Sequence, residues 1–127
     1  MFEQVVQDVS IKSYTSLTTS DVLRLYGEVV RLRSQFRQHL CQHSPVELRI
    51  VSIEELNSAD YFYWTDSRYT TLGAYYRLAN VVYLTPEALR RRNIVDHELY
   101  HYLLNDCGFG FTEAQEHEWI RAHERQD

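Results

Sequence analysis

The most informative stretch of the chain is NIVDHELYHYLLN, residues 93–105. His97 and His101 lie four residues apart in it, so on a helix their side chains stand one above the other. The apolar residues around them fall on one half of a helical wheel and predict a helix that packs by that face: Ile94, Val95, Leu99, Tyr102 and Leu103. The two histidines lie at the edge of this face, where a packed helix meets solvent.

Residues 97–101 read HELYH and follow the pattern HExxH. Two imidazole nitrogens one helical turn apart can bind a single zinc ion, and the intervening glutamate then lies beside the open position of the metal. The sequence therefore predicts zinc held by His97 and His101, with Glu98 as general base. The alternative is a surface helix with two solvated histidines.

A third ligand is expected on the last helix, because a catalytic zinc ion usually takes three protein ligands and a water. Residues 107–110 contain two glycines and predict a turn, and a capping-box pattern at Thr112 starts a helix that runs to about residue 125. A helix rises about 1.5 Å per residue, so the returning helix regains the level of His101 near positions 116 and 117. The candidates, in order of preference, are His117, Glu116 and Glu113.

Composition limits the class of protein. The chain of 127 residues is 44% hydrophobic and 24% charged, which is ordinary for one soluble domain spanning residues 1–127. Its net charge of −5 argues against a general nucleic-acid binder or a binder of anionic membranes. No apolar stretch approaches the roughly 18 residues of a membrane span, and the first residues lack a signal-peptide pattern. We therefore expect a cytoplasmic protein, either a monomer or a homodimer.

The two cysteines, Cys41 and Cys107, are too few for a disulfide scaffold. We expect each to be a small, buried or half-buried residue rather than half of a bridge or a nucleophile. Cys107 lies close enough to HELYH to be a weak alternative metal ligand.

Hydrophobic periodicity outlines the rest of the chain. It predicts one long amphipathic helix, started by capping groups at Thr19, Ser20 and Asp21, and then three strands: helix 20–43 and strands 46–51, 73–78 and 80–84. Thr85-Pro86 starts a helix that either runs into the HExxH helix or breaks near Arg92. The first 17 residues fit an edge strand or an arm. This order of elements predicts an α+β fold.

About residues 70–123 resemble the zincin metallopeptidases. The resemblance rests on the strand Gly-Ala-Tyr-Tyr, the strand Asn80–Leu84, then Thr-Pro and a helix with HELYHYLL. It implies a minimal zincin-like domain with an N-terminal backing helix and a small mixed sheet of about three strands, similar in size to minigluzincins or SprT-like peptidases. It also implies that an extended substrate pairs with the strand before the last, at Gly73, Ala74, Tyr75 and Tyr76.

The chain departs from one branch of that clan. A metzincin continues HExxHxxGxxH, whereas this chain has Leu104 and Cys107 at the glycine and third-histidine positions. A gluzincin places a glutamate further downstream, which Glu113 and Glu116 only partly match. An SprT-like arrangement, with a third histidine after a modest gap, carries over to His117.

The expected function is hydrolysis of peptide bonds in a peptide or protein substrate by a zinc-activated water, with Glu98 as general base. A second electrophile near the developing oxyanion is usual, and Tyr69, Tyr75, Tyr76 and Tyr100 are candidates. Asp96 or Asp106 could accept a hydrogen bond from a ligand histidine. The alternatives are a zincin-fold module with structural zinc or no turnover, acting as a protein-binding domain, and an interaction protein without metal.

Overall fold

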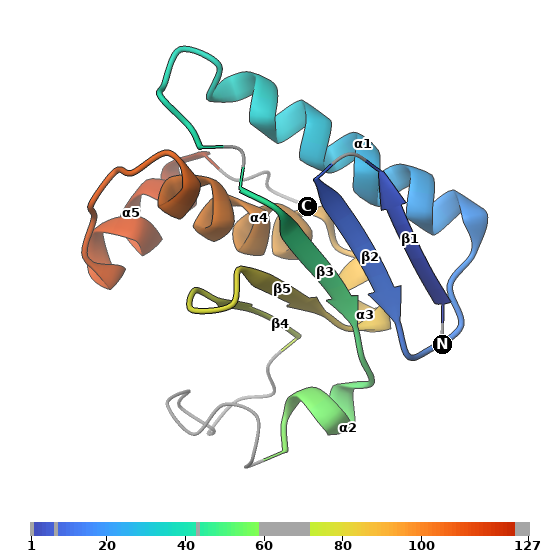
Figure 1. Cartoon of the computed structure of the whole chain (residues 1–127). Coiled ribbons are helices and arrows are strands. Elements are labelled where there is room, and N and C mark those ends of the chain that lie inside the picture. The colour runs from blue at the N-terminus through green and yellow to red at the C-terminus, as the bar shows by residue number, and fades with distance from the viewer. Residues whose placement is uncertain (1, 7, 43, 59–71, 124–127) are drawn as a thin grey trace.

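The computed structural model describes residues 2–6, 8–42, 44–58 and 72–123 (Figure 1). The candidate Tyr69 and the predicted helix end at residue 125 lie outside the described residues. Side chains of residues 2–6 are not described either.

A mixed sheet of five strands forms the centre of the fold, in the order β1-β2-β3-β5-β4. The three central strands β2, β3 and β5 are parallel to one another, and the edge strands β1 and β4 are antiparallel to β2 and β5. The bounds are Phe2–Val6, Val9–Ser13, Val46–Ile50, Gly73–Tyr76 and Val81–Leu84 for β1 to β5. The α+β class is confirmed. The prediction of about three strands is wrong. The first residues, for which the sequence fits either an edge strand or an arm, form a hairpin that adds β1 and β2 to the sheet.

Three helices form one core with one face of the sheet: α1 (Thr19–Gln35), α4 (Arg92–Asp106) and α5 (Glu113–His123). Figure 1 shows α1 and α4 side by side over this face. Alternate residues of β2 and β3 are buried on this side, as period-two strands require. The opposite face has a smaller cluster with Leu56 of α2 (Ile53–Leu56), Val81, Tyr83, and the partly buried Ala74 and Tyr76. The large core therefore lies between the sheet and the helices.

Helix α1 spans Thr19–Gln35 and is shorter than predicted. Its N-cap is Thr18, whose side chain accepts from the backbone N–H of Asp21 in a capping box. Its buried residues continue as far as Phe36, whereas Leu40, four residues further on and still inside the predicted helix 20–43, is 97% exposed. The prediction that α1 reaches residue 43 is wrong, because the chain turns at Phe36 toward the end of α4.

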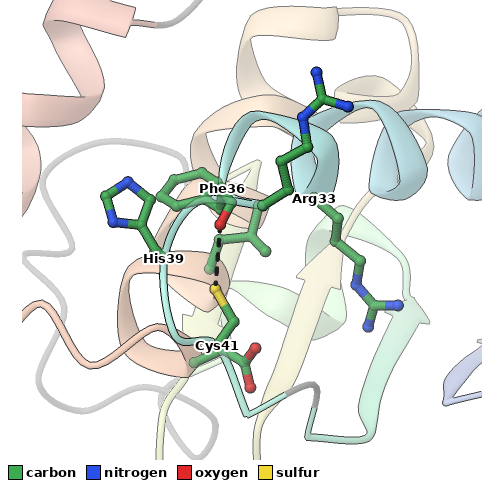
Figure 2. A pocket seen from close by; sticks show the side chains of 7 residues that line it. Arg33, Phe36, His39 and Cys41 are labelled. Carbon is green, nitrogen blue, oxygen red and sulfur yellow. Dashed lines mark hydrogen bonds between the residues drawn. The ribbon is translucent and has the colours of Figure 1, made fainter.

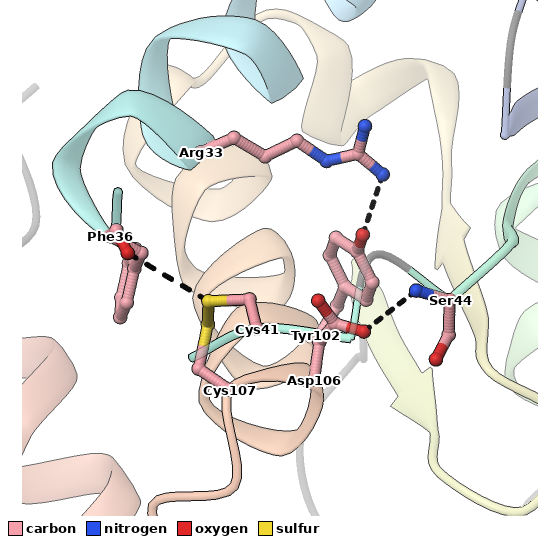
Figure 3. Close-up of a disulfide and its surroundings, with 7 residues drawn as sticks. All are labelled: Arg33, Phe36, Cys41, Ser44, Tyr102, Asp106 and Cys107. Atoms are coloured by element: carbon pink, nitrogen blue, oxygen red, sulfur yellow. Dashed lines mark hydrogen bonds between the residues drawn. A yellow bond between two sulfur atoms is a disulfide. The ribbon is translucent and has the colours of Figure 1, made fainter. Parts of the chain in front are cut away.

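A disulfide joins Cys41 to Cys107 and connects the segment after α1 to the end of α4 (Figure 3). Nearby, the backbone N–H of Gln42 donates to the carbonyl of Asp106. The expectation that the two cysteines are unbridged is therefore wrong. Because the Cys107 sulfur is bonded to Cys41, it is not a metal ligand in this structure.

After β5, the described part of the chain forms three helices. They are α3 (Pro86–Leu89), capped by Thr85, α4 (Arg92–Asp106) and α5 (Glu113–His123). The break between α3 and α4 falls at Arg90 and Arg91. The turn after α4 uses Gly108 and Gly110, both with positive φ near +66° and +67°, which reverses the chain so that α5 packs beside α4.

Candidate metal centre

Three histidines meet where α4 and α5 pack. His97 and His101 come from α4 and His117 from α5, and each offers a nitrogen within 4.8 Å of the other two. The ring centroids are 4.9 Å apart for His97 and His101, 5.0 Å for His101 and His117, and 5.7 Å for His97 and His117. Zinc–nitrogen bonds of about 2.0–2.1 Å put tetrahedral ligand nitrogens roughly 3.3 Å apart, so the three nitrogens would have to approach one another by at most about 1.5 Å to bind one ion.

All three rings are partly exposed, so this group of histidines lies at the molecular surface. A catalytic zinc ion needs this setting, because its fourth position must be open to water and substrate. A set of three imidazoles with one open side also fits the donor set of such an ion better than a closed structural site, which usually has four protein ligands.

Local sequence features of α5 place His117, the third histidine of the group. Its start is fixed by a capping box, in which the backbone N–H of Gln115 donates to the Thr112 hydroxyl and the Gln115 side chain accepts from the Thr112 N–H. Ile120 is fully buried and anchors the helix on the core. Because Ile120 and His117 lie three residues apart, the same helix face that packs on α4 carries His117 to the other histidines.

Glu116 occupies a different place from the one expected of a ligand. Its side chain is only 4% exposed, and one carboxylate oxygen lies 2.8 Å from Nδ1 of His101. Its other oxygen accepts from the guanidinium of Arg77. Glu116 therefore lies behind His101, and Glu113 is exposed and absent from the histidine group.

The surroundings of His101 favour its neutral form. Burial lowers the pKa of His101 first of all, and the neighbouring His97 and His117 lower it further, whereas the hydrogen bond to Glu116 opposes them. A neutral imidazole has one N–H, and a carboxylate can only accept. Nδ1–H therefore donates to Glu116, which leaves the lone pair of Nε2 available to a metal ion.

Glu98, the expected general base, is 8% exposed and points toward β4. At Gly73, an added Cβ would lie 3.0 Å from Cγ of Glu98 and 3.3 Å from the carbonyl oxygen of Tyr83. A Cβ at this position would be tight, so the neighbouring atoms would have to shift by a few tenths of an ångström. Gly73 therefore provides the space that Glu98 occupies.

The predicted substrate strand forms an edge of the sheet. β4 pairs with β5 on one side, and no other described strand pairs with its second side. Gly73 and Tyr75 face α4, since the Tyr75 hydroxyl donates to Asn80 and accepts from Asn105 of that helix. Ala74 and Tyr76 pack with the cluster on the opposite face.

The tyrosine candidates separate by position. The side chain of Tyr100 is buried, and its hydroxyl donates at 2.8 Å to the side chain of the exposed Gln35, at the end of α1. Tyr76 lies on the far face of the sheet. Tyr75 alone among the described candidates lies on the side of Glu98, and burial raises the pKa of its hydroxyl, which keeps it protonated at neutral pH.

Asp96 and Asp106 make other contacts than the expected ones. Asp96 accepts from Arg31 of α1 at 2.7 Å, and Asp106 accepts from the backbone N–H of Ser44 at 2.9 Å. The acceptor for His101 is instead Glu116. In the sequence, Glu116 stands out only as the residue next to His117, and nothing in the sequence indicates a role for Arg77.

A second group of potential ligands, Cys41, Asp106 and Cys107, lies at the end of α4. Its sulfurs are joined in the disulfide of Figure 3, so they offer no thiolates. The adjacent pocket in Figure 2 is formed at the end of α1, with Arg33, Phe36 and His39 around it. None of the three clustered histidines lines that pocket.

Comparison with known proteins identifies no relative. No family model, no curated protein and no solved structure matches the chain. In the described ranges, none of the helices combines the length and the apolar character needed to pass through a membrane.

Proposed function

We propose that this protein is a zinc-dependent peptidase of the zincin type, in which His97, His101 and His117 hold the metal. The observation that carries the proposal is the meeting of the HExxH histidines with a third histidine from a separate helix. A chance HExxH on a surface helix has no reason to face a further imidazole. The donor set fits zinc, which binds imidazole nitrogens well and usually has three protein ligands in a hydrolytic site.

The chain itself supplies the remaining parts of the reaction. Zinc bound here would act as a Lewis acid that polarises a peptide carbonyl and acidifies a water molecule. Glu98, held against β4, takes the proton of the attacking water and passes it to the leaving nitrogen. The edge of β4 that pairs with no other described strand would present backbone N–H and C=O groups to an extended peptide.

The substitution Glu98→Gln tests this role. The variant should contain as much zinc as the wild type, because residue 98 is not a ligand, and it should cleave a fluorescein-labelled casein about 10²–10⁴-fold more slowly, the usual contribution of a general base. Zinc binding in the wild type with equal cleavage by both proteins, or with none by either, would contradict a catalytic centre. The metal would then be structural or would serve a protein-binding module.

A further inference from the structure

A chain of polar contacts leads from the end of β4 to the metal centre. Arg77, directly after β4, donates to one oxygen of Glu116, and the other oxygen of Glu116 accepts from Nδ1 of His101. The Arg77 side chain is 52% exposed, whereas the Glu116 side chain is 4% exposed. The half-exposed Arg77 thus contacts the buried carboxylate of Glu116, which in turn contacts the candidate metal ligand His101.

Burying a carboxylate is costly unless both of its oxygens are satisfied. Among the described residues, Glu116 meets this condition through His101 and Arg77, one at each oxygen. The packing of α5 on the core is provided by Ile120. An apolar residue at position 116 would fill the same space without this cost. The arrangement is therefore better explained by what it does to His101 than by the stability of α5.

We propose that Glu116 and Arg77 are positioning residues of the metal centre: Glu116 fixes the His101 ring with Nε2 toward the metal, and Arg77 fixes Glu116. This inference rests on the proposed zinc site and deepens it. A carboxylate behind a ligand histidine sets its tautomer and ring orientation and raises its basicity, and its loss typically weakens metal binding about 10–100-fold. Arg77 acts on the metal only through Glu116.

The direct test is the affinity of the metal-free protein for Zn²⁺, measured by competition with a chromogenic chelator. Glu116→Gln should bind zinc about 10–100-fold more weakly than the wild type. Arg77→Met should lose several-fold, and Arg77→Lys should recover part of that loss, because lysine keeps the charge without the planar guanidinium. Arg121→Met, at an exposed position of α5, is the matched control and should bind like the wild type.

A double-variant cycle separates positioning from a general structural effect. Because Arg77 acts through Glu116, adding Arg77→Met to Glu116→Gln should weaken zinc binding no further. The visible absorption of bound Co²⁺ should change in Glu116→Gln and stay unchanged in Arg121→Met. If Glu116→Gln fails to fold, Arg77→Met and Arg77→Lys still decide the question, since Arg77 is half exposed.

Three results would overturn the inference. Wild-type affinity in both Glu116→Gln and Arg77→Met would show that the contacts do not position His101. Complete loss of zinc in Glu116→Gln, with zinc retained in His117→Ala, would make Glu116 a ligand. Absence of zinc binding in the wild type would remove the proposed function itself, which is a distinguishable outcome.

Discussion

At position 73, a hydrogen in place of a side chain lets Glu98 lie against β4. A Cβ there would lie 3.0 Å from Cγ of Glu98 and 3.3 Å from a backbone oxygen of Tyr83. Backbone gives way less readily than the end of a side chain, so Glu98 is the group that moves. The geometry of the general base thus depends on one glycine, and small displacements of catalytic groups are costly.

The variant Gly73→Ala should therefore lose peptidase activity by about tenfold or more while its zinc content stays that of the wild type. The matched control is Gly27→Ala, because a Cβ at position 27 meets nothing within 4 Å. That change in the middle of α1 should leave activity intact and stabilise the fold by about 0.5–1 kcal/mol. Unchanged activity in Gly73→Ala would show that Glu98 is not held by the strand.

Among the elements, α5 carries both His117 and Glu116, so its first turns belong to the metal centre. Its start is fixed by the reciprocal contacts between Thr112 and Gln115. Helix α1 begins with an equivalent box between Thr18 and Asp21, at a distance in the chain from any ligand. The two boxes allow the same perturbation to be made in a helix with ligands and in a helix without them.

Removing either cap should cost about 1 kcal/mol of unfolding free energy, because an N–H donor at the helix start loses its partner. Thr112→Ala should also weaken zinc binding, since fraying of α5 reaches the turn that holds Glu116 and His117. Thr18→Ala should bind zinc as the wild type does. Urea unfolding and chelator competition measure the two effects, and equal zinc affinity in both variants would contradict the role given to α5.

On the scale of the whole molecule, long-range links fix the ends of the helices. Arg33 of α1 donates to Asp8, which lies between β1 and β2, and to the Tyr102 hydroxyl of α4 at 2.7 Å. The disulfide joins two residues that are 66 positions apart in the sequence (Figure 3). These links join α1 and the segment after it to Tyr102 and to the end of α4, and none of them involves a histidine of the metal centre.

Loss of the disulfide should therefore destabilise the fold without emptying the metal centre. Chain entropy alone gives about 4 kcal/mol for a bridge across 66 residues, and typical measured values are about 2–4 kcal/mol. The double variant Cys41→Ser, Cys107→Ser should show this loss in urea unfolding and keep its zinc. Unfolding at the same urea concentration as the oxidised wild type would show that the bridge does not stabilise the protein.

The sequence predicts features that depend on neighbours along the chain. The period of residues 93–105 and the Thr112 box are local, and the structure has helices at both places. The prediction that α1 reaches residue 43 is wrong because Leu40 lies at helical spacing from Phe36, although the tertiary structure leaves Leu40 exposed. The Cys41–Cys107 disulfide and the contact of Arg77 with Glu116 join segments that are far apart in the sequence. The spacing of residues along the chain does not predict such contacts.

The central claim is that three histidines hold zinc, and elemental analysis tests it most directly. Purified without added metal, the wild type should contain about one zinc per chain, which His97→Ala, His101→Ala and His117→Ala should each lose. Glu113→Ala and His123→Ala, both at exposed positions of α5, should keep it. A wild type that takes up no zinc even after reconstitution, or a His117→Ala variant that retains it, would contradict the account.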